Sequence, residues 1–151
     1  MKFSWRNLKI AIAGARLSHL VQKNKIWDHG TMVETVKIIF SQVQHARKGN
    51  ETETLSKYMT PSGYTALKKQ MQDLQMKGKR WPVQHPEIKE VAVLEVSPAK
   101  YNAPDHFTAL VRETEMLVAE ELNEKKVVND FLEQWSFVRQ GDWWLLDEIR
   151  S

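Results

Sequence analysis

The feature that most constrains this chain is the Gly141-Asp142 pair, which separates two β-type runs in its last 21 residues. A two-residue loop of this composition between such runs is a strong signal for a β-hairpin. The turn also fixes the register of the two strands. The predicted partners are Gln140 and Trp143, Arg139 and Trp144, Phe137 and Leu146, and Trp135 and Glu148.

Because side chains alternate across a strand, this register divides the hairpin into two faces. One face is rich in aromatic residues and carries Trp135, Phe137, Arg139, Trp144, Leu146 and Glu148. The other carries Gln134, Ser136, Val138, Trp143, Leu145, Asp147 and Ile149. An antiparallel sheet usually exposes one face to water, so an outer face bearing Trp143, Leu145 and Ile149 needs a cover. We expect either a homodimer or the N-terminal segment to provide it.

The rest of the chain predicts helices first and strands afterwards. A T-x-x-E capping box at Thr31 and Glu34 opens a helix over residues 31–48, and Thr60-Pro61 opens another that ends near residue 77. A short helix is expected between them, at residues 53–59. The predicted strands are 88–97, 107–120, 128–140 and 143–150. This order predicts an α+β fold, with N-terminal helices packed on a curved four-stranded antiparallel sheet.

Charge divides the chain into a basic N-terminal segment, residues 1–25, and a domain over residues 26–151. The first 25 residues carry six Lys or Arg and no Asp or Glu, although the net charge of the whole chain is only +3. The other 126 residues carry 16 basic and 19 acidic side chains, which argues against a nucleic-acid surface on the domain.

The basic segment has several interpretations. It is too short and too interrupted for a transmembrane span or a secretory signal. It fits a mitochondrial targeting segment, a helix on a membrane surface, an unstructured tail or a structural helix docked on the domain. For the membrane alternative, the expected contact residues are Trp5, Arg6, Lys9, Arg16 and Lys23.

The C-terminal hairpin resembles the end of the Tim-forty-four-like domain, a family within the nuclear-transport-factor-two-like superfamily. The matching positions are Trp135, Phe137, Val138, Arg139, Gly141, Asp142, Trp144, Leu145, Leu146, Asp147, Glu148 and Ile149. The family includes the mitochondrial inner-membrane import-motor tether and bacterial relatives. The resemblance extends back to about Ile26 and implies the cone-like fold of that superfamily.

Few residues indicate catalysis. The chain has no cysteine, and its five histidines are neither paired at helical spacing nor grouped with other ligands. It also lacks the phosphate-binding and nucleophile motifs. We therefore predict no metal site, no cofactor and no catalytic residues.

The alternative hypothesis is a ligand pocket between the sheet and the helices. Its expected lining is Tyr64, Phe107, Trp135, Phe137, Trp144 and Glu148. In such surroundings the pKa of the Glu148 carboxyl would rise, as for a general acid or base. The competing interpretation is that the aromatic residues are simply core and that Glu148 reaches water or an arginine.

Two functional hypotheses follow. The resemblance implies a non-enzymatic scaffold domain on a membrane, either on the bacterial cytoplasmic side or in the mitochondrial matrix. Its partners would be anionic lipid, an acyl chain or a protein of translocation or membrane assembly. The alternative is a soluble, cytoplasmic small-molecule binder or enzyme that uses the Glu148 pocket.

Overall fold

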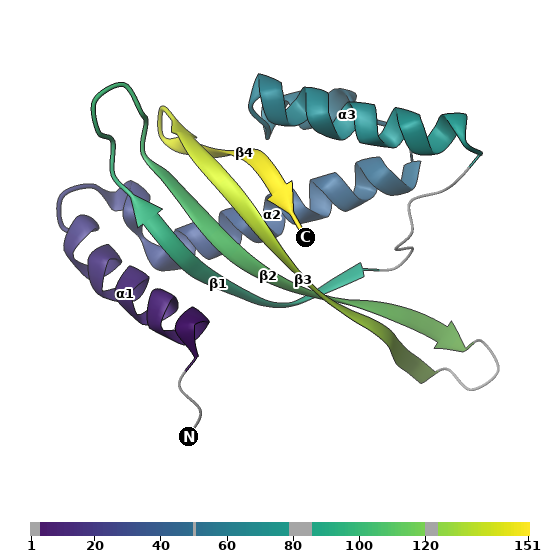
Figure 1. Ribbon diagram of the computed structural model, residues 1–151, viewed down its shortest axis with the longest axis horizontal. Helices are drawn as coiled ribbons and strands as arrows, with labels where there is room; N and C mark the ends of the chain where they lie inside the picture. The colour runs from purple at the N-terminus through teal and green to yellow at the C-terminus, as the bar shows by residue number, and fades with distance from the viewer. Residues whose placement is uncertain (1–3, 50, 79–85, 120–123) are drawn as a thin grey trace.

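Helices precede four β-strands along the described chain, and this order is the one that the sequence predicts (Figure 1). The computed structural model describes residues 4–49, 51–78, 86–119 and 124–151. The helices are α1 (Trp5–Leu20), α2 (His29–Gly49) and α3 (Pro61–Met76), with short 3-10 helices η1 (Lys25–Trp27) and η2 (Glu53–Lys57). The strands are β1 (Pro86–Ser97), β2 (His106–Ala119), β3 (Glu124–Gln140) and β4 (Trp143–Arg150). They form one antiparallel sheet in the order β1-β2-β3-β4, which confirms the predicted α+β class.

Local signals set the helix boundaries. Thr60 caps α3 as predicted, because its hydroxyl accepts a hydrogen bond from the Gly63 backbone N–H at 3.1 Å. The predicted capping box of α2 is wrong. The cap is Asp28, whose carboxylate accepts from the Thr31 backbone N–H at 2.9 Å and from the Thr31 hydroxyl at 2.8 Å. The helix therefore begins two residues earlier than expected, at His29.

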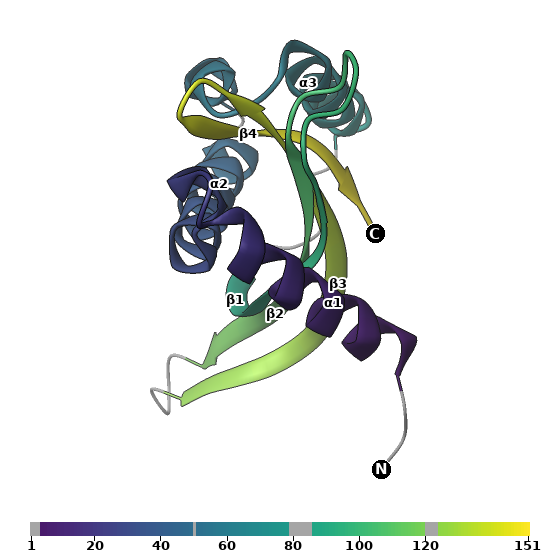
Figure 2. The same cartoon turned by 90° about the vertical axis from the view of Figure 1, so that its left-hand side faces the viewer.

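Helix α2 supplies the main apolar layer against the sheet. Figure 2 shows α2 on one side of the sheet and α1 beside β1. Four α2 residues at helical spacing, Met32, Val36, Ile39 and Val43, have no exposed surface. Spacings of three and four residues place side chains on one side of a helix, so the face against the sheet follows from helical periodicity.

Residues 5–20 form a helix docked on the domain, one of the alternatives left open by the sequence. Ala13 and Leu17 of α1 are buried in the common core. The Lys9 ammonium lies 2.7 Å from the Glu95 carboxylate of β1. Helix α1 is therefore part of the packed structure.

The predicted hairpin register is correct near the turn and wrong beyond it. Phe137 pairs with Leu146 as expected, but a bulge follows. Trp135 then pairs with Ile149, and Ser136 pairs with Glu148. A one-residue slip moves every later side chain to the opposite face. Glu148 therefore leaves the aromatic face, and Ile149 takes its place against the core.

The bulge lies where the start of α3 meets β4. The Thr60 hydroxyl donates to the Asp147 carboxylate at 2.6 Å. Gly63 packs against the same strand so closely that a Cβ there would lie 2.5 Å from the Asp147 carbonyl oxygen. This close contact requires glycine and holds the irregular backbone of β4 in place.

Both edges of the sheet are occupied by segments from the helical half. Residues 58–60 run along β4, where the Leu146 N–H donates to the Tyr58 carbonyl at 2.8 Å and the Thr60 N–H donates to the Leu146 carbonyl at 2.9 Å. On β1, the Arg16 guanidinium of α1 donates to the Val96 carbonyl at 2.8 Å.

Candidate functional site

One end of the inner sheet face is a filled aromatic core. The rings of Phe107 and Phe137 stack with their centroids 4.8 Å apart, and Trp144 meets Phe107 edge-on at 4.8 Å. Trp27 of η1 packs against Trp144 at 5.2 Å. All of these rings are at most 3% exposed. The aromatic face predicted from the hairpin exists, but its side chains fill the space with each other.

The residues predicted to line a pocket therefore have different places. Phe107, Trp135, Phe137 and Trp144 are brought together in the core. Tyr64 on α3 is half-buried beside them. Glu148 is exposed, and its carboxylate lies 3.0 Å from the Arg150 guanidinium, so the expectation that it enters an aromatic pocket is wrong.

A pocket of about 510 Å³ lies further along the same inner face, between α2, α3 and the middle of β2 and β3. Its wall is partly apolar and partly charged, and its main contributors are Arg47, Gln70, Leu74, Glu113, Phe131 and Glu133. None of the residues predicted for the pocket is in its lining.

Strand alternation brings two carboxyl groups to this pocket. On β2 the inward residues run from Phe107 through Ala109 and Val111 to Glu113, and on β3 Glu133 comes two residues before Trp135. Both glutamates thus continue the rows that form the aromatic core. The register pairs Val111 with Glu133, which places Glu113 one inward step further along β2.

Burial dominates the electrostatics of the pair. Glu113 is only 4% exposed, and the pKa of its carboxyl is raised to about 9, chiefly by loss of solvation. A side-chain hydrogen bond with Glu133 and the repulsion between the two carboxyls contribute to this rise, while Arg47 opposes it. Burial likewise lowers the pKa of Arg47 to about 10, against the attraction of Glu133 and Glu113. The pair therefore holds a proton at neutral pH.

The polar groups of the site are incompletely satisfied. The indole N–H of Trp135 donates to Glu133 Oε1 at 3.4 Å, which joins the aromatic core to the carboxyl pair. Within the described residues, Glu113 Oε1 is buried and has no hydrogen-bond partner. A buried oxygen without a partner is destabilising, and in native proteins it often marks a place that a ligand or water fills.

Sequence analysis missed Glu113 and Glu133, although one signal was present. The alternation that predicts the aromatic face runs forward from Trp135 to Glu148. The same alternation followed backward from Trp135 leads directly to Glu133. Glu113 follows from the inward row of β2 in the same way.

The five residues expected at a membrane surface lie on α1 or just after it, and they divide into those that contact β1 and those that are exposed. Lys9 and Arg16 are engaged by β1 through Glu95 and the Val96 carbonyl. Trp5, Arg6 and Lys23 are exposed.

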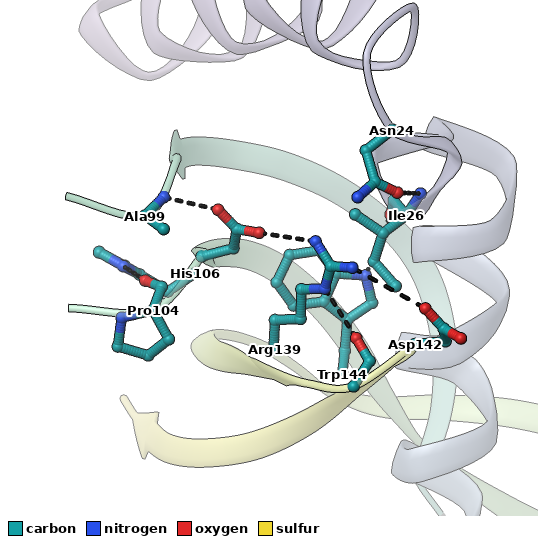
Figure 3. A network of polar contacts seen from close by, with 10 residues as sticks. Asn24, Ile26, Ala99, Pro104, His106, Arg139, Asp142 and Trp144 are labelled. Atoms are coloured by element: carbon teal, nitrogen blue, oxygen red, sulfur yellow. Dashed lines mark hydrogen bonds and ion pairs between the residues drawn. The ribbon is translucent and has the colours of Figure 1, made fainter. Parts of the chain in front are cut away.

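Arg139 belongs to a structural network at the other end of the sheet, shown in Figure 3. Its guanidinium lies 2.9 Å from the Asp105 carboxylate and donates to the Gly141 carbonyl at 2.7 Å. The Trp144 indole N–H nearby donates to the Ile26 carbonyl at 3.2 Å. These contacts tie the β1–β2 loop and η1 to the hairpin, away from the carboxyl pair.

Two further observations concern only the parts of the chain that the structure describes. They contain no group of three or more His, Asp or Glu side chains placed to hold a metal ion. Their helices are all too short or too polar to cross a bilayer.

Comparison with known proteins shows a shared fold. No family profile matches the sequence, and no curated protein matches it significantly. Among solved structures, the chain is similar to the intermembrane space region of chloroplast protein ARC6, with a TM-score of 0.54 and 14% identity. The match covers 81% of this chain and 94% of that one. At this identity the similarity concerns the fold alone.

Proposed function

We propose that this chain is a non-enzymatic binding domain that holds a small molecule in the pocket between α2, α3 and the sheet. The observation that carries the proposal is the Glu113 carboxyl, which is buried at this pocket with Oε1 unpaired in the described structure. Its volume of about 510 Å³ falls within the range of small-molecule sites.

A purely structural role explains this arrangement less well. Buried carboxyl groups with incomplete hydrogen bonding reduce stability, and apolar residues of similar volume would pack there at lower cost. The same two strands show that such packing is available, because their inward rows are apolar over the adjacent core. Placing Glu113 and Glu133 beside a cavity is consistent with a site kept for a ligand.

The test is a fragment screen by ligand-observed NMR on the full chain, with two matched variants. Leu74→Trp fills the pocket from α3 and should abolish fragment binding. Ile38→Trp adds the same ring at an exposed α2 position outside the lining and should leave binding intact. Equal binding by both variants, or no binding by the native chain, would contradict the proposal.

A second candidate function is peripheral attachment to an anionic membrane, as the Tim-forty-four-like resemblance implies. The observation that favours it is the outward side of α1, where Trp5 is 68% exposed and Ile12 is 51% exposed although the helix is docked on β1. Arg6 and Lys23 are exposed as well and would face anionic headgroups. The domain would then act as a scaffold for a protein partner at the bacterial cytoplasmic membrane or the mitochondrial inner membrane.

Liposome co-sedimentation tests this candidate without disturbing the core. The double variant with Trp5→Glu and Ile12→Glu keeps Ala13 and Leu17 buried and should lose binding to vesicles of mixed phosphatidylcholine and cardiolipin. Binding by the native chain should weaken with salt, because exposed charges are screened over about 8–10 Å at physiological ionic strength. Ile38→Glu, on the exposed side of α2, is the matched control. Equal sedimentation of the double variant and the native chain would exclude α1 as the contact and favour a cytoplasmic protein.

A further inference from the structure

We infer that the pocket binds a molecule with a protonated amine on an apolar body, and that the amine lies against the Glu113 and Glu133 carboxyl groups. The inference rests on the proposed ligand-binding function and specifies its ligand class. It depends on the charges around the pocket, the unpaired carboxyl oxygen and the apolar part of the wall.

The charge around the pocket favours a cation. Three carboxyl groups and one guanidinium line it, from Glu113, Glu133, Asp130 and Arg47. Asp130 is already bound by the Arg112 guanidinium through contacts of 2.7 to 3.3 Å. Among the described side chains that line the pocket, the Glu113–Glu133 pair thus faces one positive charge, that of Arg47, so the second carboxyl is balanced by a proton. A ligand cation can balance it instead.

The groups that face Glu113 come from three elements. Arg47 approaches from α2 and Glu133 from β3, while Ile88, its partner on β1, carries no charge. An anionic ligand would have to draw Arg47 away from both carboxyls. An ammonium group brings up to three donors for the carboxyl pair. Glu113 Oε1 is itself buried, so a rotation of the Glu113 side chain would be needed to bring this oxygen within reach of one of them.

The remaining wall suits an apolar body. Leu74 and Phe131 are half-buried at the pocket, and Leu132 is 40% exposed at its margin. A ring or short chain attached to the amine would lie against these side chains while the amine reaches the buried pair. The arrangement matches common small-molecule sites, where apolar walls give affinity and a few polar groups fix orientation.

The proton balance gives a direct signature. The ligand enters as an ammonium ion and remains one, while the proton shared by Glu113 and Glu133 leaves to solvent. Binding should therefore release about one proton per ligand at neutral pH. Affinity for the amine should then increase as the pH is raised, by at most about tenfold per pH unit, as long as the pH stays below the pKa of Glu113. No covalent bond forms or breaks except the O–H bond that releases this proton.

The experiment is isothermal titration calorimetry of the full chain at pH 7 with three probes of one shape: 2-phenylethylamine, 2-phenylethanol and 3-phenylpropionate. We expect the amine to bind at least about tenfold more tightly than the alcohol. If one proton is released, the binding heats measured in phosphate and in Tris should differ by the difference between the ionisation enthalpies of the two buffers. Glu113→Gln should weaken amine binding by about tenfold or more and remove the proton release.

The possible failures are distinguishable. Binding of the alcohol or the carboxylate as tightly as the amine would overturn the inference and leave the pocket a ligand site. Amine binding without proton release, or unchanged in Glu113→Gln, would also overturn it. If none of the probes binds and the fragment screen finds no occupant, the inference fails together with the proposed function.

Discussion

The two ends of the inner sheet face are built from the same strands and differ in what fills them. At one end Phe107, Phe137 and Trp144 stack into a closed core. At the other, Glu113 and Glu133 occupy the same inward rows and leave a cavity of about 510 Å³. The backbone pattern of the strands is common to both ends, so the inward side chains and the helices packed against them determine which end is closed core and which end has a cavity.

The closed end should be the more sensitive to truncation. Trp144→Ala should reduce the free energy of unfolding by roughly 3–5 kcal/mol, because it removes a ring that is 1% exposed and leaves a cavity. Trp143→Ala, at the neighbouring position that is 37% exposed, is the control and should change it by only about 0.5 kcal/mol. Urea denaturation measures both. A small loss for Trp144→Ala would mean that this end is not closed.

The open end should be recognisable by its pH dependence. The folded-state pKa of Glu113 is raised to about 9 from an ordinary 4.5, so its contribution to stability is fully present below about pH 4.5 and is lost as the pH rises toward 9. Glu113→Gln removes this loss. Between pH 6 and 8 the free energy of unfolding of the native chain should fall by about 2.7 kcal/mol relative to that of the variant. Parallel unfolding curves of the two chains at both pH values would show that Glu113 does not hold the proton.

Trp135 lies at the junction of the two ends. Its ring packs against Phe40 at 5.6 Å, and its N–H donates to Glu133. Trp135→Phe keeps most of the ring packing but removes the donor, so we expect a loss of about 1–2 kcal/mol. Phe40→Leu, which alters the core contact alone, is the matched variant. If Trp135→Phe leaves the pH dependence of stability unchanged while Phe40→Leu alters it, the two ends are not joined through this hydrogen bond.

The smallest effect should come from the outer face. Of the predicted patch, Ile149 packs against the core, which leaves Trp143 and Leu145. Trp143→Glu should change stability by about 0.5 kcal/mol or less. If the outer face forms a homodimer, the same substitution should halve the mass measured by light scattering. A monomer mass for both chains would refute the dimer.

Much of the fold was predictable because its signals are local. The Gly141-Asp142 turn set the first pairs of the hairpin, and Thr60-Pro61 set the start of α3. The bulge at Asp147 was not predictable, because it is associated with Thr60 and Gly63, more than 80 residues earlier. That single residue moved Glu148 out of the predicted site.

The candidate site could be predicted only in part from the sequence. Alternation places Glu113 and Glu133 on the inner face, but it does not reveal that Glu113 is buried and Glu133 half-buried. Their burial depends on Arg47 reaching them from α2 and on α3 closing the side of the pocket. Both are tertiary contacts, which the periodicity of one segment cannot report.

The contacts at the two sheet edges bear on whether the chain aggregates while it is being synthesised. A bare edge strand can recruit strands from other molecules and start aggregation. Here residues 58–60 bind to the edge of β4 and Arg16 binds to the edge of β1, and both segments precede these strands in the chain. Because the ribosome makes the chain from its N-terminus, each of these segments is synthesised before the strand that it contacts. A folded helical half therefore covers part of each edge of the finished sheet, at Leu146 on β4 and at Val96 on β1.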